Sequence, residues 1–224
     1  MKRIISILII FISFMFFASC SYNKEKDSID IYNSSLSSVV ELKVIIEDIE
    51  NYGSATCINN DRLFVTNAHI FNNKEISICN AYIRYATEDD YVNVNIINID
   101  YDKDIAYLKD NNSKLYKSLN YTYNYSTGEK VYTVGNTSNQ GISIASGIIS
   151  NSSVLVNTGS FSMNMIATDA FFAEGNSGGA LLNEEGKLLG ITTLRLKDKY
   201  GNIIYGIGYV IPIKVVIDNT PKNI

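Results

Sequence analysis

Short runs of β-branched and aromatic residues, separated by polar turns, recur along most of the chain after residue 38. The clearest is Tyr91–Ile99, where valine and isoleucine alternate with asparagine, and this period of two is typical of a strand with one buried face. The intervening turns are rich in Asn, Gly and Ser. The other predicted strands are Leu42–Ile49, Arg62–Thr66, Ala81–Ala86, Lys130–Val134, Ile142–Ile149, Ser153–Val156, Met163–Ala167, Leu188–Thr193 and Ile204–Ile211.

A sustained helical period is absent, apart from one or two turns after Pro212. About a dozen short strands without intervening helices predict an all-β fold of antiparallel barrels or sandwiches rather than a parallel sheet. A polar, tyrosine-rich interval, Asn111–Thr127, divides the strands into two similar sets, although no internal sequence repeat is visible. We therefore expect two β-domains, over residues 39–122 and 123–224, with a short helix at the end of the second.

The first 20 residues have the pattern of an export signal. A short basic start is followed by the apolar stretch Ile4–Ala18, and about 15 residues is too short to span a membrane comfortably but suits a secretory signal. The stretch ends in Phe17-Ala18-Ser19-Cys20, which resembles the bacterial lipobox except that Phe17 replaces the more usual leucine. The resemblance implies a signal peptide over residues 1–19 and acylation of Cys20. The alternative is a plain signal peptide with an incidental thiol at Cys20.

Residues 20–38 are polar, charged and serine-rich without a sustained apolar period. This composition predicts a flexible tether between the membrane and the folded part of the chain.

The composition is that of a globular protein, with 46% apolar and 19% charged residues. The net charge is −4, and removal of residues 1–19, which contain Lys2 and Arg3 and no acidic residue, lowers it to −6. A mildly acidic chain gives no reason to expect a nucleic-acid partner. With one histidine and no C-x-x-C motif, the sequence also gives no support for a zinc site, and we expect no cofactor.

The stretch Glu174–Leu182, with the sequence EGNSGGALL, carries the most specific chemistry. Ser177 lies between glycines, which permit a tight turn, and we expect the amides of Gly175 and Ser177 to point inward and receive a developing oxyanion. Three interpretations compete: an ordinary Gly-Ser turn, the nucleophile elbow of α/β-hydrolases, and a serine protease turn. The elbow requires a histidine after the serine, but the only histidine, His69, lies upstream.

His69, Asp104 and Ser177 instead follow the His, Asp, Ser order of chymotrypsin. The motifs around them resemble trypsin-like serine proteases, specifically the HtrA/Deg branch, over residues 39–213. The matching stretches are Val65-Thr66-Asn67-Ala68-His69, Asp104-Ile105-Ala106, Val134-Gly135-Asn136, Ser146-Gly147-Ile148-Ile149-Ser150, Thr168-Asp169-Ala170, Gly175-Asn176-Ser177-Gly178-Gly179-Ala180-Leu181 and Gly206-Ile207-Gly208-Tyr209-Val210-Ile211-Pro212.

The resemblance implies two perpendicular six-stranded antiparallel β-barrels with the active site in the cleft between them. It also implies that Ser177 is the nucleophile, that His69 is the general base and acid, and that Asp104 orients the imidazole. Gly175 and Ser177 would supply the oxyanion-hole amides. Asp100 and Asp102 compete with Asp104, but the apolar run after Asp104 favours a strand that would bury this carboxylate beside the histidine.

Several positions depart from the digestive relatives. Asn176 replaces the aspartate that would pair with a freshly cut N-terminus, which argues against activation by N-terminal cleavage. Phe171, six residues before Ser177, would lie near the floor of the specificity pocket, and it argues against a preference for Lys or Arg. A small or medium apolar residue at the cleaved position is our hypothesis. The residues expected to contact substrate are Phe171, Glu174, Thr193, Leu194 and Arg195, and the strand over the last three is expected to pair with substrate backbone.

Cys57 and Cys79 lie in predicted strands, and a disulfide and two free thiols both remain open. Many relatives have a cysteine directly after the histidine, where this chain has Ile70. HtrA proteins usually carry PDZ domains after the protease and form trimers; the residues after the last predicted strand are too few for such a domain, and the oligomeric state is left open.

These observations predict a serine endopeptidase that is exported to the bacterial envelope or surface, is lipid-anchored, and acts on proteins or peptides. The alternative is a non-catalytic surface lipoprotein that keeps this fold to bind host or envelope proteins. An esterase using the same residues is a third possibility, since acyl transfer to serine serves esters and amides alike.

Overall fold

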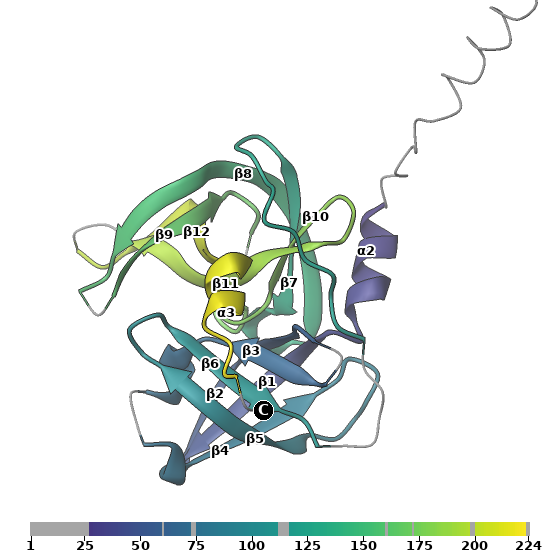
Figure 1. Ribbon diagram of the computed structural model, residues 1–224, viewed down its shortest axis with the longest axis vertical. Helices are drawn as coiled ribbons and strands as arrows, with labels where there is room; N and C mark the ends of the chain where they lie inside the picture. The colour runs from purple at the N-terminus through teal and green to yellow at the C-terminus, as the bar shows by residue number, and fades with distance from the viewer. Residues whose placement is uncertain are drawn as a thin grey trace, which may run out of the picture.

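Two closed antiparallel barrels of six strands each form the body of the protein (Figure 1). The structure is a computed structural model, and it describes residues 27–222 apart from residues 60, 73–74, 112–116, 160, 172 and 198–199. In the first barrel the strand order is β1-β2-β3-β6-β5-β4, and in the second it is β10-β11-β12-β9-β8-β7. The predicted all-β fold and the two-barrel architecture implied by the resemblance are confirmed.

The first barrel contains β1 (Val39–Ile46), β2 (Ile49–Cys57), β3 (Leu63–Thr66), β4 (Cys79–Arg84), β5 (Val92–Asp100) and β6 (Ile105–Lys109), with 3-10 turns η1 (Ala68–Phe71) and η2 (Ile76–Ile78). The single strand predicted over Leu42–Ile49 is wrong at its end. The chain turns at Glu47, which has a φ of 56°, and pairs back on itself through Ile46 and Ile49.

The second barrel contains β7 (Lys130–Asn136), β8 (Ile142–Asn157), β9 (Ser162–Thr168), β10 (Ala180–Asn183), β11 (Leu188–Lys197) and β12 (Ile203–Pro212), with the 3-10 turn η3 (Thr137–Asn139). The two strands predicted over residues 142–149 and 153–156 form one strand, β8. Its pairing with β9 shifts register between Ile149 and Asn151 and again between Asn151 and Val154. These irregularities let one long strand bend around the barrel.

Two faces of the same strands build two different cores. Phe64 of β3 and Leu108 of β6 point into the first barrel, whereas Leu63, Val65 and Tyr107 belong to a core shared with the second barrel. Because successive side chains of a strand point to opposite faces, a strand buried on both sides is apolar throughout. The shared core fixes the two barrels relative to each other, which is the condition for a site built from both.

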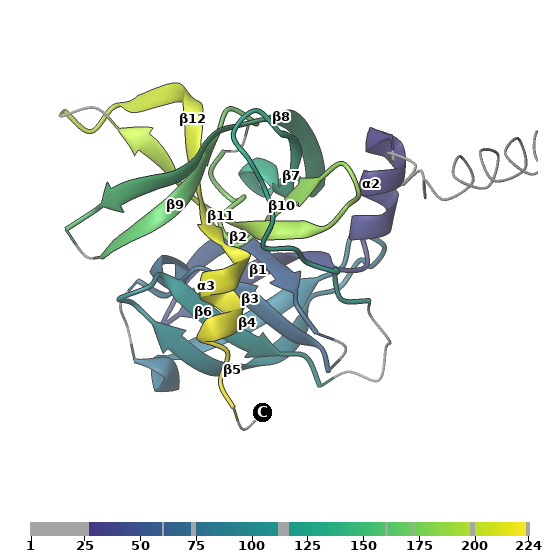
Figure 2. The same ribbon diagram turned by 45° about the horizontal axis from the view of Figure 1, so that its top comes forward.

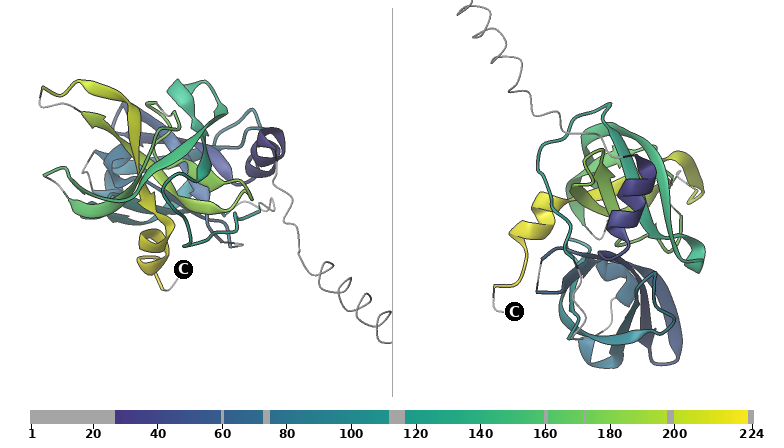
Figure 3. Two further views of the ribbon diagram at one scale, coloured as in Figure 1. Left: turned by 90° about the horizontal axis from the view of Figure 1, so that it is seen from above. Right: turned by 90° about the vertical axis from the view of Figure 1, so that its right-hand side faces the viewer.

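Two helices fasten the barrels together. The predicted helix after Pro212 is present as α3 (Ile213–Asp218), and it lies against the first barrel, where the Tyr107 hydroxyl donates to the Val216 carbonyl at 2.6 Å (Figure 2). Helix α2 (Ser28–Ser35) lies beside the second barrel (Figure 3). Its Ile31 is fully buried in the shared core, and the Tyr32 hydroxyl donates to the Ile142 carbonyl at 2.9 Å.

The expectation of a flexible tether over residues 20–38 is therefore wrong for residues 28–35. Asp27 caps α2 by accepting a hydrogen bond from the Asp30 amide at 2.8 Å, and burial of Ile31 then holds the helix in place. Only Ile29, Ile31 and Tyr32 are apolar or aromatic within Ser28–Ser35, which is too few for a sustained apolar period in the sequence. The predicted signal peptide and Cys20 lie outside the described residues, and within the described part no helix has the length and apolar character needed to cross a membrane.

Candidate active site

Strands β3 and β6 bring His69 and Asp104 together. The two strands pair antiparallel, with Thr66 opposite Ala106, so the end of β3 lies beside the start of β6. His69 follows β3 in the turn η1, and Asp104 directly precedes β6. The backbone amide of His69 donates to Asp104 Oδ1 at 2.9 Å, which holds the two residues together independently of the imidazole.

The carboxylate of Asp104 is almost completely buried, with 2% of the residue exposed. Its Oδ2 accepts a hydrogen bond from the Thr193 hydroxyl at 2.6 Å, and its two oxygens lie 2.9 and 3.0 Å from His69 Nδ1. The backbone of Asp104 is left-handed, with a φ of 54°, a conformation that aspartate tolerates better than most residues. Asn67 supports this turn by donating from its side-chain amide to the Asp104 carbonyl at 3.0 Å.

Ser177 reaches the same imidazole from the second barrel. Its Oγ lies 3.2 Å from His69 Nε2 and 3.3 Å from the Thr193 carbonyl. Because the carboxylate lies at Nδ1, the hydrogen-bond network assigns the imidazole proton to that nitrogen and leaves Nε2 as an acceptor facing the hydroxyl. The His69 side chain is 44% exposed, so this end of the arrangement is open to a bound molecule.

Two backbone amides lie beside the serine without an acceptor. Within the described residues neither Gly175 N–H nor Ser177 N–H donates a hydrogen bond. The carbonyls of the same two peptide units are held: Glu174 O accepts from the Ser138 amide at 2.7 Å, and Asn176 O accepts from the Gly179 amide at 2.7 Å. In a trans peptide the C=O and N–H point in opposite directions, so both amides point away from these partners.

Ser54, which the sequence analysis missed, connects this turn to the first barrel. The residue is fully buried in β2; its hydroxyl accepts from the Asn136 amide and donates to the Gly175 carbonyl, both at 2.8 Å. Its amide also donates to the Ser177 carbonyl at 2.8 Å. A Gly-Ser dipeptide within a strand carries no signal for this role, because the partners lie more than 80 residues away in the chain.

The predicted substrate-contacting residues separate into two hollows. Glu174 lines one of them together with His69 and Ser177 and with β2 residues Glu50–Tyr52. Phe171 and Arg195 line the other, which is formed mostly by β12. Phe171 lines this second hollow and is 57% exposed, and its place near a pocket floor stays a prediction.

For the remaining two positions, Thr193 and Leu194, the prediction concerns mainly the backbone of their strand. The hydroxyl of Thr193 turns inward to Asp104, so only its backbone faces the serine. The side chain of Leu194 lies outside the described residues, while its backbone pairs with Tyr209 of β12. On the other edge of β11 no strand in the described parts of the chain pairs with residues 193–195, which leaves their backbone groups free to bind an extended peptide.

Cys57 and Cys79 are both buried and form no disulfide with each other, which decides between the two alternatives that the sequence left open. Burial raises the pKa of the Cys57 thiol to about 11. The described residues contain no group of three or more potential metal ligands.

The chain is similar to trypsin-like peptidases in both sequence and fold. The family described as "Trypsin-like peptidase domain" matches residues 53–191, which include all three residues of the Asp–His–Ser arrangement. The solved structure "HtrA-type protease AlgW with tripeptide" superposes with a TM-score of 0.72 at 24% identity, covering 84% of this chain and 60% of that chain. At this identity the structural likeness shows a shared fold.

Curated relatives agree with the family match. "Serine endoprotease DegS" of Haemophilus influenzae is 32% identical over 199 residues, covering 85% of this chain and 55% of that protein. "Probable periplasmic serine endoprotease DegP-like" of Buchnera aphidicola subsp. Baizongia pistaciae is 36% identical over 167 residues, covering 70% of this chain and 33% of that protein. The chain thus spans about half or less of the length of these relatives.

Proposed function

This chain belongs to the trypsin-like peptidase family, and on that premise we propose that it is a serine endopeptidase of the HtrA type. One observation carries the proposal: a continuous hydrogen-bonded path runs from the buried Asp104 through His69 to Ser177. The path ends beside the Gly175 and Ser177 amides, which have no hydrogen-bond acceptor among the described residues. This is the arrangement that acyl transfer to a serine hydroxyl requires.

In the proposed reaction, Ser177 Oγ attacks the substrate carbonyl carbon while His69 Nε2 takes the hydroxyl proton. The carbonyl oxygen becomes an oxyanion and accepts hydrogen bonds from the Gly175 and Ser177 amides. The imidazolium then gives its proton to the leaving amine as the C–N bond breaks, and an acyl-enzyme remains. Water, deprotonated by the same imidazole, hydrolyses the ester and restores the hydroxyl. Asp104 stabilises the imidazolium and keeps its proton on Nδ1.

The unpaired edge of β11 supports a protein or peptide as the substrate. The backbone of residues 193–195 begins beside the serine, where the Thr193 carbonyl accepts from Ser177 Oγ at 3.3 Å. Along the edge that no described strand covers, it offers an extended chain the hydrogen bonds of an added strand. We infer that the acyl side of the substrate lies along this edge. The leaving side then lies over the hollow between His69, Glu174 and β2.

We further propose that the protein acts outside the cytoplasm and is anchored through Cys20. The basic and apolar start of the chain and its lipobox-like end support export and acylation, and a DegP-like relative is described as periplasmic. Metabolic labelling with a radioactive fatty acid tests the anchor. The label is expected on the wild type and absent from Cys20→Ser, and equal labelling of both would contradict the assignment.

The decisive experiment for the activity is labelling with a fluorophosphonate probe, followed by cleavage of a casein or peptide library. We expect Ser177→Ala to lose both, with unchanged circular dichroism. A folded wild-type protein that is neither labelled nor cleaves any peptide would refute the peptidase and favour the non-catalytic binding protein. Labelling and ester hydrolysis without peptide cleavage would favour an esterase.

A further inference from the structure

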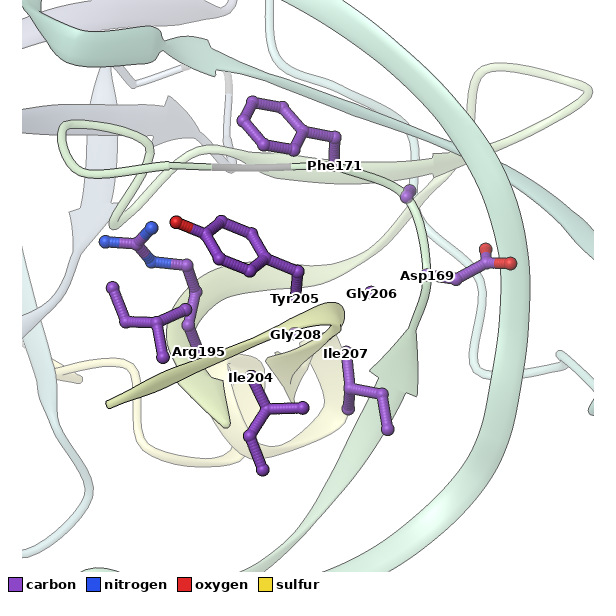
Figure 4. Close-up of a pocket in the computed structure, with 10 residues that line it drawn as sticks. Asp169, Phe171, Arg195, Ile204, Tyr205, Gly206, Ile207 and Gly208 are labelled. Atoms are coloured by element: carbon purple, nitrogen blue, oxygen red, sulfur yellow. The ribbon is translucent and has the colours of Figure 1, made fainter. Parts of the chain in front are cut away.

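The hollow lined by Phe171 and Arg195 has mostly apolar walls and one cationic side chain (Figure 4). Its other lining residues are Asp169, Ala170 and the start of β12, Ile203–Gly208. Figure 4 shows the Phe171 ring, the Tyr205 ring and the Arg195 guanidinium projecting toward the same side of the hollow. A ligand side chain that enters there meets hydrocarbon surface and a positive charge together.

This hollow lies on the acyl side of the proposed cleavage site. Arg195 is two residues beyond Thr193 on β11, and the Thr193 carbonyl is 3.3 Å from Ser177 Oγ. Two strand residues span about 7 Å, which a substrate also covers with about two residues when it lies alongside. Phe171 enters from the segment that leads to the nucleophile turn, and its carbonyl is fixed by the Thr133 hydroxyl at 2.7 Å.

No described carboxylate neutralises the positive charge of Arg195. Asp169 is the one acidic residue among the described residues that line the hollow. Its carboxylate accepts a hydrogen bond from the Ile148 amide at 2.6 Å and points to the opposite side in Figure 4. Among the described residues no carboxylate forms an ion pair with Arg195. Arg195 is itself half-buried. A guanidinium at the edge of an apolar wall binds a carboxylate in bidentate fashion more strongly than it would in open water.

Resting on the proposed peptidase function, we propose that Arg195 makes this protein selective for substrates with an acidic side chain among the three residues before the cleaved bond. The apolar walls receive the methylene groups of a glutamate, and the guanidinium receives its carboxylate. This selectivity differs from the preference for a small or medium apolar residue that the sequence suggested, because the cationic Arg195 lines the same hollow as Phe171.

Internally quenched peptides test the selectivity. One cleaved sequence is made with Glu, Gln or Lys at each of the three positions before the cleaved bond, and kcat/KM is measured for the wild type and for Arg195→Gln. At one position we expect kcat/KM for the Glu peptide to exceed that for the Gln peptide by about tenfold. This ratio lies between the small effect of an exposed ion pair and the about hundredfold effect of a buried hydrogen bond to a charged group. In Arg195→Gln this ratio is expected to approach one.

Lys130→Gln is the matched control, because it removes one positive charge from the same barrel at a position paired with Glu184 at 3.3 Å. It is expected to keep the full preference. A ratio near one in the wild type at all three positions, or a preference that persists in Arg195→Gln, would overturn the proposal while leaving the peptidase intact. Fluorescence anisotropy of the same peptides on Ser177→Ala protein gives a second readout that does not depend on cleavage. Equal binding of the Glu and Gln peptides would likewise overturn the proposal.

Discussion

Replacement of Ser54 by alanine tests whether the first barrel positions the oxyanion amides. The hydroxyl joins the Asn136 amide to the Gly175 carbonyl, and Ser54 is fully buried. Ser54→Ala therefore leaves two buried backbone groups without partners. Each unsatisfied group costs about 1–3 kcal/mol, so we expect the free energy of unfolding to fall by about 2–6 kcal/mol.

The effect on activity is expected to be larger than stability alone explains. Gly175 supplies one of the two proposed oxyanion donors, and loss of one such donor costs about 3–4 kcal/mol in a comparable site. Ser54→Ala loosens this donor without removing it. We therefore expect kcat to fall about tenfold to a hundredfold while KM changes little, because the ground-state carbonyl depends less on the donor than the oxyanion does.

The assay compares Ser54→Ala with Ser35→Ala at a temperature where both variants are folded. Ser35 is equally buried, and its hydroxyl donates to the Tyr32 carbonyl at 2.7 Å in α2, away from the site. Urea titrations give the unfolding free energies, and a quenched peptide gives kcat and KM. Equal kcat values for the two variants would refute a positioning role for Ser54 and leave it a purely structural residue.

Two further predictions concern contacts around the same centre, and a third concerns a thiol buried in the first barrel. Thr193→Val removes the hydroxyl that donates to the Asp104 carboxylate at 2.6 Å. Because a hydrogen bond to a charged group contributes about 1.5–3 kcal/mol, we expect kcat/KM for a peptide to fall about tenfold to a hundredfold. An unchanged kcat/KM would contradict this prediction. Gly175→Ala places a Cβ 2.2 Å from the Asn136 carbonyl oxygen, at a residue whose φ is 91°. We therefore expect the turn to shift and fluorophosphonate labelling of Ser177 to become at least about tenfold slower. Labelling at the wild-type rate would count against this turn geometry. Burial raises the pKa of the Cys57 thiol from 9.0 to about 11, so the stability that the neutral thiol contributes is present below pH 9.0 and is lost as the pH rises toward about 11. In urea titrations at several pH values, Cys57→Ala should show a smaller decline of the unfolding free energy over this range. The same decline in both proteins would contradict the prediction.

Local sequence determined much of this protein. Period-two alternation and turn residues predict the β class, and the order of His69, Asp104 and Ser177, with the motifs around them, predicts which side chains meet. These features are readable because they depend on near neighbours: a glycine turn, a strand after Asp104, a short helix after Pro212.

Contacts between distant segments were decided only by the tertiary structure. Whether Phe171 forms a pocket floor depends on how β12 curves beside it, and whether Ser54 matters depends on a turn 121 residues away. The single apolar anchor of α2, Ile31, has no periodic context, yet the shared core buries it completely. The apolar pattern of a strand specifies that its faces are buried. The packing of one barrel against the other decides what each face contacts, because hydrophobic burial has no preferred direction whereas hydrogen bonds do.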